Sequence, residues 1–343
     1  MKTRTIRFVD VGVADYAVCE VPDPTEDEVV VNTSYTTISN GTERENLLGL
    51  QCNARQPYDP KWVPHGFPRV LGYSGSGIVE WVGKNVTSVK VGDRVACSSG
   101  THRKHLVRPE RLVTKLPENL PLCDAAIAHI ANFPLGGVRK TRVEIGESAC
   151  VTGLGILGLF AVQYMKCAGA YPVIAADLNP ARRELALTLG ADFALNPADA
   201  DYVEQIRALT EGRMVQAAVE VTGSGQALDR LLDVMAFRGR IALLGCTRDP
   251  NFTIDYYRKV HYPGIELIGA HAGARPQTDS SRDAWTEKDD VVTVLRLAVA
   301  KRIVLGGLIQ ETHRPTEAPE VYARLANDKN FPVCVQFDWR DEE

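Results

Sequence analysis

Apolar and polar residues alternate in two different ways along this chain. In the first 125 residues, short apolar runs between turn-forming residues predict β-strands, at 28–31, 77–82 and 94–97. Beyond residue 125, apolar runs of strand length are each followed by a stretch with the spacing of an amphipathic helix. This change predicts a β-rich part followed by an α/β part.

The second part repeats the strand-then-helix order several times, which predicts a parallel sheet with crossover helices. The expected strands lie at 149–152, 172–176, 217–221, 241–244 and 265–268, and the expected helices at 156–169, 180–189 and 226–236. A Gly/Pro-rich stretch at 269–276 is followed by a helix at 287–301 and a strand at 332–338. We interpret this order as an α/β unit inserted into the β-rich unit, which resumes near the C-terminus.

Length and composition fit two globular domains with a small-molecule partner. Of the 343 residues, 45% are hydrophobic and 24% charged, and the net charge of −4 gives no electrostatic case for nucleic acid or an anionic membrane as partner. The N-terminal residues do not resemble a signal peptide, and the apolar runs are shorter than the ~20 residues that span a bilayer. The eight cysteines are scattered and form no Cys-x-x-Cys pair, so we expect a cytoplasmic protein without disulfides.

A glycine pattern follows the expected strand at 149–152 and opens the helix after it. It reads Gly-Leu-Gly-Ile-Leu-Gly over 153–158. Between a strand and a helix, this spacing lets the first glycine form a tight turn, the second admit a pyrophosphate to the backbone N–H groups of the helix start, and the third pack close to the strand. We therefore predict that a dinucleotide binds at Gly153, Gly155, Ile156, Leu157 and Gly158.

An acidic residue ends the next expected strand and predicts which dinucleotide binds. Asp177 lies 24 residues after Gly153, near the ~20 expected for a carboxylate that hydrogen-bonds the adenosine ribose and repels a 2′-phosphate. This favours NAD over NADP, with Asn179 and Arg182 as further adenosine contacts, although Arg182 and Arg183 are also compatible with a 2′-phosphate. Because ligands bind at the carboxyl ends of strands in this fold, we expect further cofactor contacts at Thr222, Gly245 and Ala270.

Three more motifs, together with the glycine pattern, carry a resemblance to a known family. They are Ile-Ser-Asn-Gly-Thr-Glu at 38–43, Leu-Gly-Tyr-Ser-Gly-Ser-Gly-Ile-Val at 71–79 and Val-Gly-Asp-Arg-Val at 91–95. In order and spacing the chain resembles the medium-chain dehydrogenase/reductase superfamily, which includes the zinc-type alcohol dehydrogenases. The resemblance implies a GroES-like β-rich catalytic domain, at 1–128 and 271–343, and a Rossmann domain with a doubly wound parallel sheet, at 129–270.

At the positions where zinc-dependent members carry their metal ligands, this chain has other residues. They are Asn40, Tyr73, Ser74 and Ala128, whose amide, phenol, hydroxyl and methyl groups do not replace thiolate, imidazole and carboxylate around Zn²⁺. The four-cysteine lobe of zinc members is also missing after Val95. We therefore predict no bound metal, with His129 more plausible as an acid–base group than as a displaced ligand.

Without a metal, hydrogen-bond donors must stabilise the substrate oxygen. By resemblance, Thr42 contacts that oxygen, Glu43 orients the site and Glu45 stands where some members carry a relay histidine. Tyr73 either donates to the substrate oxygen or forms an apolar wall, and His129 completes the expected catalytic set. The expected substrate contacts are Asn40, Ser74, Asn132 and His271, with Arg275 nearby in sequence, whereas we interpret His102 and His105 as a solvated surface.

Within the superfamily, the motifs resemble a metal-poor branch similar to sugar and cyclitol dehydrogenases and to bacteriochlorophyllide hydroxyethyl dehydrogenases. This implies an NAD-dependent enzyme that interconverts a secondary alcohol and a ketone on a polyhydroxy substrate. Two alternatives stay open: a zinc-free, NADPH-dependent quinone or enoyl reductase, and a dinucleotide-binding module without catalysis. Members are commonly dimers or tetramers, so we expect a homo-oligomer with its interface strand at 265–270.

Overall fold

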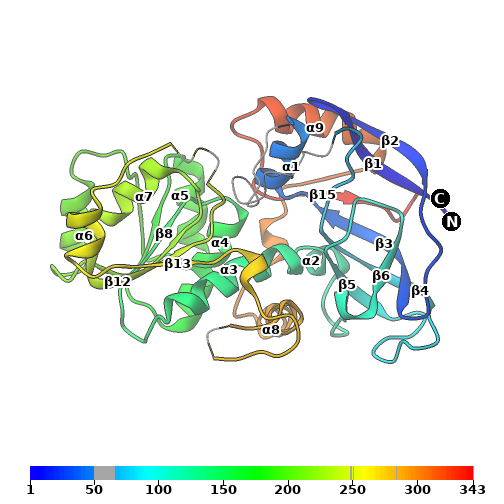
Figure 1. Cartoon of the computed structure of the whole chain (residues 1–343), viewed down its shortest axis with the longest axis horizontal. Helices are drawn as coiled ribbons and strands as arrows, with labels where there is room; N and C mark the ends of the chain where they lie inside the picture. The colour runs from blue at the N-terminus through cyan, green and yellow to red at the C-terminus, as the bar shows by residue number, and fades with distance from the viewer. Residues whose placement is uncertain (50–65, 248, 250, 283, 343) are drawn as a thin grey trace. The chain divides into compact units, whose positions relative to one another are not determined.

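The structure, a computed structural model, describes residues 1–49, 66–247, 249, 251–282 and 284–342. Within them the chain forms two compact units, Met1–Ile130 with Val291–Glu343, and Ala131–Asp290 (Figure 1). The second unit is thus inserted into the first. It includes residues 271–290, in which Arg275 and Asp290 are bonded to residues of α3 (Ala128–Thr141).

The first unit is β-rich. A two-stranded antiparallel sheet pairs β1 with β2, and a seven-stranded sheet has the order β14-β15-β3-β4-β5-β7, with β6 also paired to β3. The strands are β1 (Lys2–Asp10), β2 (Val13–Glu20), β3 (Glu28–Thr37), β4 (Ser74–Val82), β5 (Arg94–Ser98), β6 (His105–Pro109), β7 (Val113–Lys115), β14 (Glu311–His313) and β15 (Val335–Asp338). All three strands predicted in this part are confirmed, and β3 and β4 are longer than the predicted ranges 28–31 and 77–82.

Helices of the first unit pack on these sheets. They are α1 (Asn40–Leu47), α2 (Leu122–Ala125) and α9 (Ala318–Asn327), while α3 (Ala128–Thr141) and α8 (Glu287–Val299) run across the division between the units. Helix α9 contacts β2 and α1 (Figure 1). A core of Phe8, Leu47, Tyr322, Phe337 and Trp339 joins these elements, so strands from both ends of the chain share one hydrophobic core.

The second unit contains a parallel six-stranded sheet in the order β10-β9-β8-β11-β12-β13. The strands are β8 (Ala149–Thr152), β9 (Val173–Ala176), β10 (Phe193–Leu195), β11 (Val215–Glu220), β12 (Met235–Leu243) and β13 (Glu266–Gly269). Its crossover helices are α4 (Ile156–Ala168), α5 (Pro180–Thr188), α6 (Tyr202–Leu209) and α7 (Gly225–Leu232). This confirms the doubly wound Rossmann arrangement. The helix predicted at 226–236 ends at Leu232, because the chain already enters β12 at Met235.

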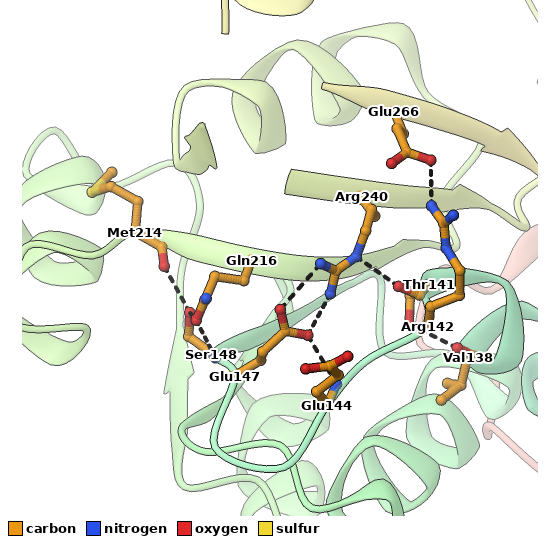
Figure 2. A network of polar contacts seen from close by, with 10 residues as sticks. All are labelled: Val138, Thr141, Arg142, Glu144, Glu147, Ser148, Met214, Gln216, Arg240 and Glu266. Atoms are coloured by element: carbon orange, nitrogen blue, oxygen red, sulfur yellow. Dashed lines mark hydrogen bonds and ion pairs between the residues drawn. The ribbon is translucent and has the colours of Figure 1, made fainter. Parts of the chain in front are cut away.

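An ion-pair network lines the amino-terminal edge of this parallel sheet (Figure 2). The Arg240 guanidinium contacts both carboxylate oxygens of Glu147 and donates from Nε to the Thr141 carbonyl oxygen, at 2.7 Å. Arg142 pairs with Glu266 of the edge strand β13, and the Ser148 hydroxyl donates to the Met214 carbonyl oxygen at 2.6 Å. These contacts tie α3, β8, β11, β12 and β13 together at the edge opposite the carboxyl ends of the strands.

Five short helical turns complete the described structure: η1 (Glu110–Leu112), η2 (Tyr257–His261), η3 (Ala272–Ala274), η4 (Gly306–Leu308) and η5 (Pro315–Glu317). In the described ranges, no helix has the length and apolar character needed to cross a membrane. Seven cysteines are free thiols, and Cys52 lies outside the described residues.

Candidate functional site

The glycine loop lies between β8 and α4, where the sequence places it. Gly153 has a φ of +91°, and a Cβ there would approach the Thr222 Cγ2 to 2.7 Å, so only glycine suits the turn. A Cβ on Gly158 would overlap the Gly153 carbonyl oxygen, whereas the space next to Gly155 is open. No side chain caps α4 at Gly155. The N–H groups of its first turn, at Ile156, Leu157 and Gly158, therefore fit an anionic pyrophosphate.

Asp177 directly follows β9 and is fixed against this loop. Its Oδ2 accepts a hydrogen bond from the Leu154 N–H at 2.7 Å, and its Oδ1 accepts one from the Asn179 N–H at 2.8 Å. Each carboxylate oxygen keeps a second lone pair, so Asp177 can still accept a ribose hydroxyl. The predicted carboxylate thus has a second role, because it also holds the glycine loop.

The two other predicted adenosine contacts lie at the start of α5. The Asn179 Oδ1 accepts hydrogen bonds from the Ala181 and Arg182 N–H groups, so this oxygen caps the helix. Arg183 donates from Nη1 to the carbonyl oxygens of Asp177 and Leu178, at 2.7 and 3.0 Å. Arg183 therefore braces the turn that carries Asp177, and Arg182 is the half-exposed arginine beside it.

The strand ends of this sheet lie at one edge, as parallel register requires. Thr152 of β8 pairs with Ala176 of β9 and Glu220 of β11, and Leu243 of β12 pairs with Glu220 and with Gly269 of β13. The residues that follow these ends are those predicted to contact the cofactor: Thr222, Gly245 and Ala270. Thr222 lies against Gly153, and Gly245 lies against the Gly223 backbone, so these loops pack together.

Sequence reasoning missed Glu220, which organises these loops. Its carboxylate is 3% exposed and accepts hydrogen bonds from the N–H groups of Thr222, at 2.7 Å, and Gly223, at 3.1 Å, and from the Thr222 hydroxyl. Burial raises the pKa of Glu220, while these hydrogen bonds act in the opposite direction. An acidic residue at the end of an apolar strand, directly before a Val-Thr-Gly turn, was the available signal.

In the first unit, α1 begins with the motif at 38–43. Asn40 donates from Nδ2 to the Pro332 carbonyl oxygen at 2.7 Å, Thr42 is half-buried on the same helix, and Glu45 is half-buried one turn further on. Glu43 is fully buried and accepts hydrogen bonds from the Ser39 N–H, at 2.8 Å, and from Tyr322. The motif therefore combines a helix start with a buried carboxylate.

Tyr73 precedes β4 and points to Ser39, the residue before α1. The two hydroxyl groups are hydrogen-bonded, and the Tyr73 ring lies edge-on to the His129 ring with 5.4 Å between centroids. The structure thus brings together Tyr73 and His129 of the predicted catalytic set. Ser39 was not among the predicted site residues, since its type is common in turns and its partner lies 34 positions away.

Ser74, predicted to contact the substrate, forms hydrogen bonds within the protein. Its hydroxyl, on a residue that is 2% exposed, donates to the Ala126 carbonyl oxygen at 2.6 Å and accepts from the Ile130 N–H at 3.3 Å. Both partners belong to the segment around α2 and α3. Ser74 therefore joins β4 to the start of α3 through its hydroxyl group.

His102 corrects the expectation that it lies on a solvated surface. It is 1% exposed, not solvated, and its Nε2 lies 3.0 Å from the Glu43 Oε2. His105 is half-buried, with its Nε2 3.5 Å from a Glu80 carboxylate oxygen. The charged residues around His102 suggested a surface loop, but the chain turns inward at this position.

The remaining predicted substrate residues lie in the second unit. Asn132 is fully buried, and its Oδ1 and backbone carbonyl oxygen both accept hydrogen bonds from Arg275, the latter at 2.7 Å. Arg275 also lies 3.5 Å from Asp290, which pairs with Arg139. Asn132 therefore anchors Arg275, and its role as a substrate contact stays a prediction. His271 is exposed, and its Nδ1 accepts from the Gly273 N–H at 3.0 Å.

Comparisons with known proteins agree with this geometry. The model of the alcohol dehydrogenase GroES-like domain matches residues 25–118, and the model described as zinc-binding dehydrogenase matches residues 157–287. L-Threonine 3-dehydrogenase of Pyrococcus furiosus is 31% identical over 290 residues, which are 75% of this chain and 79% of that protein. The chain belongs to the medium-chain dehydrogenase/reductase superfamily.

Two other members of this superfamily cover more of the chain. D-Guloside 3-dehydrogenase of Escherichia coli strain K12 is 28% identical over 315 residues, 88% of this chain and 89% of that protein. The crystal structure of galactitol-1-phosphate dehydrogenase from Escherichia coli has the same fold, with a TM-score of 0.82 at 20% identity over 98% of this chain and 99% of that one. The chain is thus a dehydrogenase-type oxidoreductase with a dinucleotide site.

The residues at the superfamily's metal positions do not fit a zinc ion. Asn40, Tyr73 and Ser74 offer no thiolate, imidazole or carboxylate, and their side chains are hydrogen-bonded to Pro332, Ser39 and Ala126. Ala128 offers a methyl group. In the part of the chain that the structure describes, no group of three or more histidine, cysteine and acidic residues is placed to hold a metal.

Proposed function

We propose that this protein is an NAD-dependent oxidoreductase that interconverts a secondary alcohol and a ketone on a polyhydroxy substrate, without a catalytic zinc ion. The substrate class is a sugar, a glycoside or a cyclitol. The observation that carries the proposal is the hydrogen-bonded hydroxyl pair of Ser39 and Tyr73, since the resemblance puts Tyr73 at a position where zinc-dependent members have a metal ligand.

The second unit supplies the cofactor site. A bound nicotinamide dinucleotide accepts or supplies the hydride. The first-turn N–H groups of α4 hold the pyrophosphate, and Asp177 accepts the ribose hydroxyls and disfavours a 2′-phosphate by charge repulsion. Glu220 keeps Thr222 against the glycine loop, so that the loops at the carboxyl ends of the parallel strands are already in place before a cofactor binds.

The hydroxyl pair can supply the proton transfer to and from the substrate oxygen. When Ser39 donates its proton to the Tyr73 oxygen, the phenolic O–H is free to donate to a substrate oxygen. In ketone reduction Tyr73 gives this proton to the carbonyl oxygen, and the Ser39 hydroxyl stabilises the phenolate that forms. In alcohol oxidation the phenolate takes the proton back. The His129 ring, edge-on to Tyr73, restricts the orientation of the phenol.

The polyhydroxy substrate is supported by two features. D-Guloside 3-dehydrogenase of Escherichia coli matches 88% of this chain, and its name describes oxidation of a glycoside. The helix start at Asn40 to Thr42 also presents amide and hydroxyl groups, which suit a substrate whose hydroxyls would otherwise lose hydrogen bonds to water. Thr42 is the expected contact to the reacting oxygen, with Glu45 and Asn40 nearby on α1.

We further propose that the protein is a cytoplasmic homo-oligomer, a dimer or tetramer, without nucleic acid or membrane as partner. The position of β13 at the edge of the parallel sheet supports strand pairing between copies. Leu267 in this strand is 37% exposed, which supports an apolar contact there.

A substrate panel tests the proposed reaction. The protein is incubated with NAD⁺ or NADP⁺ and polyols, glycosides and cyclitols, and absorbance of the reduced cofactor is followed. We expect NAD⁺-dependent turnover of at least one polyhydroxy compound. Preference for NADPH with a conjugated enone would establish the reductase alternative instead, and tight cofactor binding without turnover on the panel would favour the non-catalytic module.

The variant Tyr73→Phe tests the role of the phenol. Loss of a positioned acid–base group should lower kcat about 100-fold or more. Tyr35→Phe is a matched control, because Tyr35 is a half-buried tyrosine of β3 outside the site. If Tyr73→Phe turns over at the rate of the control, Tyr73 is the apolar wall and not the acid.

A further inference from the structure

A buried polar cluster lies directly behind the Ser39–Tyr73 pair. Its centre is Glu43, which is 0% exposed, with His102 at 1% and Tyr322 at 0%. The Glu43 Oε2 accepts hydrogen bonds from His102 Nε2, at 3.0 Å, and from the Tyr322 hydroxyl, at 2.5 Å. Burying a carboxylate is unfavourable unless its hydrogen bonds are satisfied. His102 and Tyr322 therefore do more than fill space, because they compensate the burial of Glu43.

The hydrogen bonds around His102 define its protonated nitrogen. Trp339 donates from Nε1 to the Thr36 hydroxyl oxygen at 2.9 Å, and this oxygen lies 2.7 Å from His102 Nδ1. If the Thr36 hydroxyl donates to Nδ1, then Nε2 carries the proton and donates it to Glu43. We assign this tautomer because it gives every one of these groups a partner. The cluster is then a fixed chain from Trp339 to Glu43.

Glu43, at one end of this row of hydrogen bonds, holds Ser39. The second carboxylate oxygen of Glu43, Oε1, accepts the Ser39 N–H at 2.8 Å. The Ser39 hydroxyl does not cap α1, although serine commonly does so, because it is bonded to Tyr73. The Glu43 carboxylate therefore fixes the Ser39 backbone at the start of α1 and so sets where the Ser39 hydroxyl lies.

His102 also holds the segment that carries Tyr73. The backbone N–H of His102 donates to the Leu71 carbonyl oxygen at 2.8 Å, and the His102 ring packs on Gly72. A Cβ on Gly72 would lie 2.5 Å from the ring, and Gly72 has a φ of +92°, so glycine is required here. His102 thus contacts both the backbone that carries Tyr73 and, through Glu43, the backbone that carries Ser39.

We propose that His102 and Tyr322 are positioning residues, which through Glu43 and Gly72 hold the Ser39 and Tyr73 hydroxyl groups in the geometry that transfers the proton. This inference rests on the proposed function, because it gives Tyr73 the role of the acid. It extends that function to two side chains that are buried and do not meet the substrate themselves. They act only through the residues that they hold.

Two conservative variants test the inference. Tyr322→Phe removes one hydroxyl without changing the packed ring, and His102→Gln keeps an amide donor that can reach Glu43. The matched control is Tyr202→Phe, which removes the hydroxyl of a tyrosine that is 1% exposed in α6. The full-length protein is used throughout. The ring-carbon NMR signal of Tyr73, assigned with Tyr73→Phe, reports the hydroxyl environment without requiring turnover.

We expect Tyr322→Phe to shift the Tyr73 signal and to lower kcat about 10- to 100-fold with little change in the KM for NAD⁺, because misplacement by about 1 Å costs this much. His102→Gln should shift the signal less, and Tyr202→Phe not at all. An unshifted Tyr73 signal in Tyr322→Phe, or a kcat equal to that of Tyr202→Phe, would overturn the inference. A shifted signal in a protein without turnover of any polyhydroxy compound would uphold the positioning and overturn the proposed function.

Discussion

At the residue scale, the site depends on carboxylates that hold backbone N–H groups. Asp177 holds Leu154 and Asn179, Glu220 holds Thr222 and Gly223, and Glu43 holds Ser39. In each case a carboxylate oxygen fixes a turn directly before or after residues of the proposed site. Charge-assisted hydrogen bonds of this kind are stronger than neutral ones, so they preform the turns.

The double role of Asp177 makes a specific cofactor prediction. Asp177→Asn removes the charge but keeps one oxygen acceptor, whereas Asp177→Ala removes both acceptors. We expect both variants to raise the affinity for NADP⁺ relative to NAD⁺ by about tenfold or more, since a charge opposite a phosphate costs on the order of 1–2 kcal/mol. Asp177→Ala should in addition weaken both cofactors, because the Leu154 N–H loses its acceptor. Fluorescence titration gives the two dissociation constants, and an unchanged ratio in both variants would remove Asp177 from the ribose site.

Glu220 makes a prediction about pH. Burial raises the pKa of Glu220 above its usual 4.5, so the folded state disfavours its ionisation. The contribution of Glu220 to stability is therefore fully present below pH 4.5 and decreases as pH rises through the raised pKa. In urea unfolding, the free energy of unfolding of the wild type minus that of Glu220→Gln should fall as pH rises from 4.5 through the raised pKa. A difference that stays constant or grows with pH would contradict the predicted direction.

The elements differ in how well the sequence predicts them. The glycine loop, Asp177 and the strands β8, β9 and β13 follow from local patterns, since each depends on residues that are close in sequence. The buried cluster does not, because Glu43 meets His102 over 59 positions and Tyr322 over 279. Asn132 likewise meets Arg275 over 143 positions, so a free amide seemed available to the substrate. Pairings of this kind are set by the tertiary fold and leave no periodic signal.

At the scale of elements, the amino-terminal and carboxyl-terminal ends of the parallel strands have different roles. The amino edge carries the Arg240–Glu147 pair, whose side chains are 17% and 16% exposed, and the carboxyl edge carries the cofactor residues. Glu147→Gln and Arg240→Met should each lower the free energy of unfolding by about 1–3 kcal/mol, because one partner of a largely buried pair is lost. The affinity for NAD⁺ should stay the same. Loss of NAD⁺ affinity in the folded variants would show that the edges are coupled.

For the whole molecule, the edge strand β13 predicts how copies associate. The Ala270 N–H donates to the Leu243 carbonyl oxygen of β12, and N–H groups alternate in direction along a strand, so the Leu267 N–H faces away from β12. Leu267→Pro should therefore be tolerated by the sheet and should remove a donor needed for pairing with a second copy. We expect a smaller species by light scattering than for Leu267→Thr, which keeps the N–H. Equal oligomeric states for the two variants would place the interface elsewhere.

The whole molecule combines a superfamily architecture with residues that do not suit its metal. The matched domain models are those of dehydrogenases, while the resemblance puts Asn40, Tyr73, Ser74 and Ala128 at the metal positions. The central claim is therefore that hydroxyl groups, and not a zinc ion, handle the substrate oxygen.

Metal content measured together with turnover tests this claim most directly. The zinc content of the purified protein is determined, and the initial rate of NAD⁺ reduction with the best polyhydroxy substrate is compared before and after dialysis against a chelator. We predict less than one equivalent of zinc per chain and an unchanged rate after dialysis. One full equivalent of zinc, with a rate that is lost on chelation and restored by added zinc, would contradict the claim.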